Sequence, residues 1–145
     1  PCVLDVYGDI ANIKYYEDCK KFAKQISTDS KIVNFINHVD FETFSNNSSK
    51  YHFSCLHTYA ENFGHSIIES FYLGIPVLIS KNTTPWKNLC NNGLGYDLDL
   101  KIDLHVSVLQ DYKNKIEILN DEKRFDYLMN FEKNIYDNTL KLYEA

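Results

Sequence analysis

The chain has 145 residues, enough for one domain with a hydrophobic core and too few for two full α/β domains. Hydrophobic residues make up 44% of it, and no apolar run approaches the roughly 18 residues that a membrane-spanning helix needs. The net charge is -5 and the Lys and Arg residues are scattered, which excludes a surface for a phosphate backbone. We therefore expect a single domain that has no transmembrane segment and binds no nucleic acid.

Short β-rich runs alternate with helical runs along the first 100 residues. The predicted strands are residues 2–7, 31–35, 51–56, 76–80 and 96–98. The predicted helices are residues 15–27, 41–47, 64–73 and 85–91. Because the strands are apolar runs joined by helices, we expect an α/β fold, with a parallel sheet and helices on both faces. The glycines expected at turns are Gly8, Gly74, Gly93 and Gly95.

Beyond Leu100 the apolar residues recur at a helical period, first over 104–119 and then over 125–142. This predicts two C-terminal helices that pack on the sheet or on another part of a longer protein. The chain starts with Pro1 inside a strand-like run, so we expect a fragment of a longer protein.

The four cysteines show neither a CxxC pair nor metal-ligand spacing with the five histidines. They are Cys2, Cys19, Cys55 and Cys90. We interpret them as reduced core thiols of a cytosolic protein, and we expect no metal site.

Two carboxylates with seven residues between them, Glu61 and Glu69, are the most informative feature of the sequence. Asn62 is a good N-cap and Gly64 lets backbone N–H groups approach a ligand, so a helix should begin here with its positive end exposed. The run follows the 51–56 strand, and ligands of open α/β sheets bind at that edge, at a topological switch point. Glu69 offers two acceptors that match a vicinal diol, and Glu61 could hold the hydroxyls of a second sugar. The run predicts a site for an anion or a polar sugar.

Each of these residues also has a structural interpretation. A lone Glu in a helix is usually a solvated surface residue, but apolar neighbours such as Ile67 and Phe71 predict that the helix of Glu69 is largely buried. A buried carboxylate needs a partner. We expect His65 to be a cap or surface residue rather than a base, and Trp86 to be a packing residue rather than a stacking platform.

Several segments together resemble a known family. The run LHTYAENFGHSIIE at 56–69 is continued by GIPVLIS at 74–80 and by TPWKNL at 84–89, and it is preceded by LDVYG at 4–8 and VNF at 33–35. Over residues 2–100 the chain resembles the donor half of retaining GT-B glycosyltransferases of family 4 (glycosyl transferases group 1). The resemblance implies a Rossmann-like parallel sheet, one half of a GT-B fold. It further implies that residues 1–145 form a single nucleotide-sugar (donor) binding domain, without the N-terminal acceptor domain, and that this fragment alone is inactive.

The resemblance also implies roles for individual residues. Glu69 would hold the ribose hydroxyls, and Glu61 would be the catalytic residue that faces and positions the donor sugar. The residues whose amides would line the sugar and the pyrophosphate are Asn62, Phe63, Gly64 and His65. The residues that would meet the nucleotide from the strand ends are Gly8, Ile36, Asn37 and His38. The Arg and Lys that neutralise the diphosphate in the family have no counterpart after Gly8, and His57 stands where the family often has Pro.

The implied activity is a hexosyltransferase-like transfer of a sugar, with retention, from a nucleotide-sugar to a glycan or lipid-linked acceptor. No cofactor and no metal ion would be required, since catalysis depends on electrostatic support of the departing diphosphate. The implied context is bacterial surface polysaccharide (capsule or lipopolysaccharide) biosynthesis. The expected location is the cytoplasm, either free or as peripheral membrane association at the inner face of the plasma membrane.

Of four other functions, two remain as alternatives and two are disfavoured by the sequence. A nucleotide-sugar epimerase of GT-B fold and a non-catalytic nucleotide-binding module both remain as alternatives. A glycoside hydrolase is disfavoured, because its two carboxylates lie about 5 to 9.5 Å apart, whereas eight helical positions span ~12 Å. A dinucleotide oxidoreductase is disfavoured because the segment after the first strand, YGDIA at 7–11, lacks the G-x-G-x-x-G turn.

Overall fold

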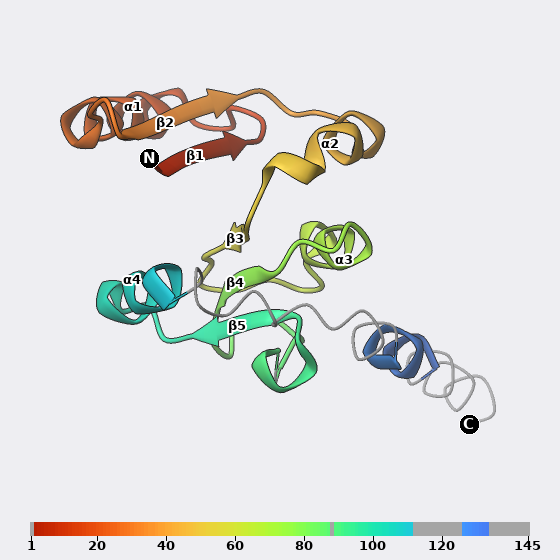
Figure 1. Ribbon diagram of the computed structural model, residues 1–145. Coiled ribbons are helices and arrows are strands. Elements are labelled where there is room, and N and C mark those ends of the chain that lie inside the picture. Colours follow the sequence, from red (N-terminus) through yellow and green to blue (C-terminus); the bar gives the residue numbers. More distant parts are fainter. Residues whose placement is uncertain (1, 88, 112–125, 134–145) are drawn as a thin grey trace. The chain divides into compact units, whose positions relative to one another are not determined.

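The computed structural model describes residues 2–87, 89–111 and 126–133. These residues form a mixed α/β structure with helices and two short parallel sheets (Figure 1). The chain divides into two compact units, residues Pro1–Asn46 and Asn47–Ala145, and each is described by itself. The expected α/β class and the parallel pairing of strands are confirmed. A single Rossmann-like sheet and a single domain stay predictions.

Unit 1 is a β-α-β segment followed by a short helix. It contains β1 (Cys2–Tyr7), α1 (Ile13–Ile26), β2 (Lys31–Ile36) and α2 (Phe41–Asn47). β1 and β2 pair in parallel, and the side-chain amide of Asn34 donates to the Asp5 carboxylate at 2.8 Å across this pair. On α1, Tyr16 packs edge-on against Phe35 of β2, with ring centroids 5.5 Å apart. The helix therefore covers the face of the sheet to which Phe35 belongs.

Both helices of unit 1 begin at a capping side chain. The side-chain oxygen of Asn12 accepts from the Tyr15 amide at 2.9 Å at the start of α1. Before α2, the Asp40 carboxylate accepts from the Thr43 amide at 2.7 Å, and this hydrogen bond lowers the pKa of Asp40. Capping thus explains why these two helices start where they do.

Unit 2 contains a three-stranded parallel sheet in the order β3-β4-β5. Its elements are η1 (Ser48–Lys50), β3 (Ser54–Leu56), α3 (His65–Tyr72), β4 (Val77–Ser80), η2 (Cys90–Asn92), β5 (Gly95–Leu98) and α4 (Ile102–Asp111). All four residues of β4 are buried, as a central parallel strand requires. A topological switch point needs a reversal of strand order, and neither sheet contains one among the described residues.

The hydrophobic core of unit 2 lies between α3, β4 and the loop that follows β4. Its buried members are Ile67, Phe71, Val77, Ile79, Trp86, Leu89, Leu94 and Leu128. Leu128 comes from residues 126–133, which are helical and belong to the second predicted C-terminal helix. α4 has no buried residue. The remaining parts of the two predicted C-terminal helices, at 112–125 and 134–145, lie outside the described residues.

Some sequence-based expectations are wrong in detail. No helix forms over the described part of 85–91: residues 85–87 are irregular, and only the 3-10 turn η2 follows (Asn88 lies outside the described residues). The Thr84 hydroxyl accepts from the Trp86 amide at 3.2 Å, which forms a local turn in place of a first helical turn. The predicted 51–56 strand begins only at Ser54. The other elements predicted within the first 100 residues agree within one or two residues at each end.

The cysteines also differ from the expectation. Cys2 and Cys55 are exposed, and only Cys19 is half-buried. The interpretation as core thiols is wrong for Cys2 and Cys55, because Cys2 is the first residue of β1 and Cys55 belongs to the edge strand β3. The structure does not describe the side chain of Cys90. None of the described helices combines the length and the apolar character that crossing a bilayer demands.

Candidate functional site

The carboxylate of Glu61 caps the start of α3. Glu61 Oε1 accepts from the amide of Phe63 at 3.3 Å and from the amide of Gly64 at 3.2 Å. Gly64 is the N-cap residue of α3, with φ 76°, and no side chain of its own can cap the helix. A carboxylate near the positive end of a helix is electrostatically favourable. The loop thus binds one oxygen of Glu61, and Oε2, which has no partner among the described residues, can accept from a ligand.

This arrangement changes the roles expected for the neighbouring residues. Asn62 is exposed and is not the N-cap, because Gly64 takes that position and Glu61 supplies the acceptor. The amides of Phe63 and Gly64, expected on the ligand, bind Glu61 instead. His65 is the exposed first residue of α3, and its ring lies 5.1 Å from that of Phe63. The expectation of a surface histidine is therefore confirmed.

Two hydrogen bonds from backbone amides join the loop after β3 to the end of β4 and to the loop that follows it. The Thr58 amide donates to the Ser80 hydroxyl at 2.8 Å, and the Glu61 amide donates to the Thr83 carbonyl at 2.8 Å. β3 and β4 are parallel neighbours, so their carboxyl ends lie at the same edge of the sheet. Glu61 is held at this edge, which is where ligands of parallel α/β sheets bind.

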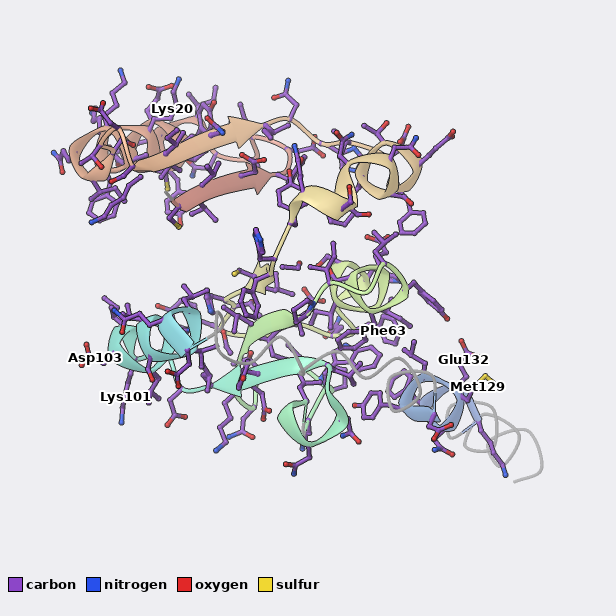
Figure 2. The ribbon with its side chains drawn as sticks, viewed as in Figure 1. Lys20, Phe63, Lys101, Asp103, Met129 and Glu132 are labelled. Carbon is purple, nitrogen blue, oxygen red and sulfur yellow. The ribbon has the colours of Figure 1, made fainter. Side chains whose placement is uncertain are left out.

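Trp86 makes the third connection between the two loops. Its indole N–H donates to the Phe63 carbonyl at 2.6 Å, and its side chain is 1% exposed. The ring stacks on Phe131 with centroids 4.2 Å apart and meets Phe71 edge-on at 5.3 Å. Trp86 is thus a packing residue, as expected. Figure 2 shows the side chains of this region and labels Phe63 near α3.

Glu69 lies on α3, between the buried residues Ile67 and Phe71 in sequence. It is half-buried, and its carboxylate has no hydrogen-bond or ion-pair partner among the described residues. The next residue, Ser70, is fully buried and donates to the Ser66 carbonyl at 2.7 Å. A half-buried carboxylate without a protein partner can accept hydrogen bonds from a ligand hydroxyl.

The remaining predicted site residues belong to unit 1. Gly8, Ile36 and Asn37 line a cavity of about 380 Å³ at the carboxyl ends of β1 and β2. Most of its wall is apolar or aromatic, and it includes Tyr15 and Tyr16 of α1. His38 is exposed and does not line this cavity. The predicted residues therefore form two groups, one in each unit.

A histidine pair close to the loop after β3 is a feature that the sequence analysis missed. His57 Nε2 lies 3.2 Å from His105 Nδ1, and His105 Nε2 lies 3.1 Å from the Asp99 carbonyl. A carbonyl only accepts, so Nε2 of His105 carries a proton and its Nδ1 accepts from His57 when both rings are neutral. Partial burial, and then the neighbouring His105, lower the pKa of His57. The 48-residue separation of the two histidines gives no local signal in the sequence.

In the described part of the chain, no three His, Cys, Asp or Glu side chains lie close enough together to hold a metal ion. The candidate site is therefore defined by Glu61, Glu69 and the backbone at the start of α3.

Comparison with known proteins does not place the chain in a family. No family model, no curated protein and no solved structure matches it. The resemblance described above therefore enters only as a proposal.

Proposed function

We propose that this chain is the donor-binding part of a retaining GT-B glycosyltransferase that takes its sugar from a nucleotide-sugar. The observation that carries the proposal is the anchored carboxylate of Glu61 at the start of α3. The acceptor would be a glycan or a lipid-linked sugar, and the context would be surface polysaccharide biosynthesis at the cytoplasmic side of the membrane. The sequence resemblance over residues 2–100 supports this choice among the functions that a parallel α/β sheet can serve.

Glu61 is suited to bind a sugar because one of its oxygens is anchored. Oε1 is bound by two amides, so the carboxylate is oriented before any ligand arrives. Oε2 can then accept from a donor-sugar hydroxyl without a loss of side-chain freedom at that moment. The proposed role of Glu61 is to hold and orient the donor sugar.

Glu69 is suited to bind the ribose. It is a half-buried carboxylate on the same helix and has no partner among the described residues. Two adjacent ribose hydroxyls can donate to its two oxygens, in the manner of the acidic residue of dinucleotide-binding folds. Burial strengthens such hydrogen bonds to a charged acceptor. Glu69 should therefore contribute to nucleotide affinity rather than to the selection of the sugar.

The test is an NMR titration of the ¹⁵N-labelled 145-residue chain with UDP, GDP and ADP, and then with their sugars. We expect shifts of the Asn62–His65 amides with one nucleotide. Glu69→Ala should raise the Kd for that nucleotide by about ten- to a hundredfold, since hydrogen bonds to a charged group contribute about 1.5 to 3 kcal/mol. Glu132→Ala is the matched control, because Glu132 is an exposed carboxylate of unit 2 that bonds only to Tyr72 among the described residues.

Two results would refute the proposal. One is the absence of shifts at millimolar nucleotide; the other is equal binding by wild type and Glu69→Ala. Product analysis on the protein that carries this chain separates the alternatives. A transferase gives a glycosylated acceptor and free nucleotide, an epimerase gives an isomeric nucleotide-sugar, and a non-catalytic module leaves the nucleotide-sugar unchanged.

The unit 1 group is tested separately. We propose that Gly8, Ile36 and Asn37 contact the nucleotide, as the resemblance implies, and the cavity that they line supports this. The same titration reports on it through the amides of these three residues. If the amides of Gly8, Ile36 and Asn37 do not shift, the proposal for unit 1 is wrong, and the roles proposed for Glu61 and Glu69 are judged by their own test.

A further inference from the structure

The position of the Glu61 carboxylate depends on a chain of two hydrogen bonds that begins in the core. The Phe63 amide donates to Glu61 Oε1 at 3.3 Å, and the Phe63 carbonyl accepts from Trp86 Nε1 at 2.6 Å. Phe63 is thus held on both sides of its own backbone. A shift of its carbonyl would rotate the adjoining peptide units and move the amides that orient Glu61.

Trp86 itself has little freedom to move. Its ring is stacked on Phe131 and meets Phe63 edge-on at 5.5 Å, and its amide donates to the Thr84 hydroxyl. A side chain enclosed in this way keeps one rotamer, so its N–H has a fixed direction. Trp86 can therefore transmit the rigidity of the core to the loop.

Packing alone does not explain a tryptophan at this position. The aromatic neighbours would accept another flat apolar ring, and a buried N–H is costly unless it has an acceptor. In this structure the N–H binds a loop carbonyl beside the proposed sugar-binding carboxylate, rather than a group inside the core. The indole N–H of Trp86 thus binds the Glu61–Gly64 loop, whereas its ring packs in the core.

We propose that Trp86 is a positioning residue for donor binding: its indole N–H fixes the Phe63 carbonyl and thereby orients the Glu61 carboxylate toward the sugar. This inference rests on the proposed function. It assigns Trp86 no contact with the ligand. It separates the hydrogen bond, which serves the site, from the packing of the ring, which serves the fold.

The test compares wild type, Trp86→Phe and a chain with benzothienylalanine at position 86, which keeps the indole shape and lacks the N–H. The probes are UDP, GDP and ADP and their glucose conjugates. For the glucose conjugate that wild type binds, we expect the Kd to rise about five- to tenfold in both variants, the effect of one lost hydrogen bond. The Kd of the free nucleotide should change less than twofold, because it lacks the sugar. The Phe63 and Gly64 amides should exchange with solvent about tenfold faster.

The matched control is Tyr127→Phe. Tyr127 lies in the same aromatic cluster, with its ring centroid 6.3 Å from that of Trp86. Its hydroxyl faces the Lys87 carbonyl at 3.5 Å rather than the Glu61–Gly64 loop before α3. This variant should leave both Kd values and both exchange rates unchanged. If Trp86→Phe does not fold, the benzothienylalanine chain decides, since its shape is nearly that of the native ring.

The outcomes distinguish this inference from the proposed function. If wild type binds the glucose conjugate and the two variants bind it equally well, the positioning role is wrong and the proposed function stands. An equal loss of affinity for nucleotide and glucose conjugate would also overturn the inference, because it would indicate general damage to the unit. If wild type binds none of the probes, the proposed function itself fails.

Discussion

Glu61 is both a capping group and a candidate ligand-binding group. Its Oε1 serves the amides at the start of α3, and its own amide donates to Thr83, so backbone and side chain are both held. Such double anchoring is typical of side chains that must keep one orientation. A residue with this pair of contacts is more costly to replace than an exposed carboxylate, because its loss leaves two amides at the helix start without an acceptor.

The histidine pair predicts a pH effect in unit 2. The pKa of His57 lies below its ordinary value of 6.5, so the unfolded chain binds the proton more readily than the folded chain. The contribution of this group to stability is present above pH 6.5 and is lost as the pH falls through the folded pKa. The free energy of unfolding should therefore decrease as the pH is lowered from 7 to 5.

The measurement is an NMR titration of the imidazole signals, together with urea unfolding at pH 7 and pH 5. His105→Gln should raise the pKa of His57, because it removes the neighbouring positive charge. His65→Gln is the control, since it removes an exposed imidazole that does not contact this pair. A His57 that titrates at or above 6.5 in the wild type would contradict the prediction.

At this scale the sequence identifies the important carboxylates but not their contacts. The spacing of Glu61 and Glu69 correctly predicts one acid on the loop and one inside the helix. The binding of Glu61 to its own loop depends on the left-handed backbone of Gly64 and on the Thr83 tether. The Thr83 tether is set by tertiary structure, so no local pattern could have indicated it.

The pairing of β4 and β5 depends on a glycine at the first position of β5. Gly95 has φ 137° and is paired with Val77, and a Cβ at this position would overlap the Val77 backbone. Gly64 also has a positive φ, but a Cβ there would lie 2.7 Å from Ile67 Cδ1, the end of a flexible side chain. A backbone neighbour cannot move away without breaking the strand pairing, whereas a side-chain end can.

The two glycines therefore predict different losses of stability on substitution by alanine. Gly95→Ala should lower the free energy of unfolding by about 3 kcal/mol or more, as overpacking against a fixed neighbour does. Gly64→Ala should lower it by about 1 to 2 kcal/mol, the cost of a left-handed residue with a Cβ. Urea unfolding followed by circular dichroism measures both. Equal losses, or the reverse order, would show that the backbone at Gly95 can yield.

Elements were predictable where hydrophobic period and capping agreed. α1 and α2 follow side chains that cap them, and β4 is an apolar run between Gly74 and a polar loop. The helix predicted over residues 85–91 is wrong because the buried residues Trp86 and Leu89 have a helical spacing that comes from loop packing. The turn made by Thr84 and the indole hydrogen bond to Phe63 take precedence over the periodicity.

At the scale of the whole molecule, burial is distributed very unevenly. Every residue of β4 in unit 2 is buried, whereas Ala23 is the one buried residue among the described residues of unit 1. Many apolar side chains of unit 1 are exposed, among them Val3, Leu4, Val6, Ile13, Tyr15, Phe22, Ile26 and Ile32. The alternation of strands and helices predicted parallel pairing, but it could not predict this division, because burial depends on contacts distant in sequence.

This difference predicts two classes of backbone stability. Amides of β4 should open only when unit 2 unfolds, because all four residues are buried and the strand is paired on both sides. Amides of β1 and β2 should exchange about tenfold faster or more, since their strands are paired on one side and mostly exposed. Hydrogen exchange followed by mass spectrometry, corrected for intrinsic rates, measures this at peptide resolution. β5, which is half-buried and pairs only with β4 among the described strands, should lie between the two classes. Equal protection of β1 and β4 would contradict the prediction, because it would require the exposed strands of unit 1 to open only in the same cooperative step as the core of unit 2.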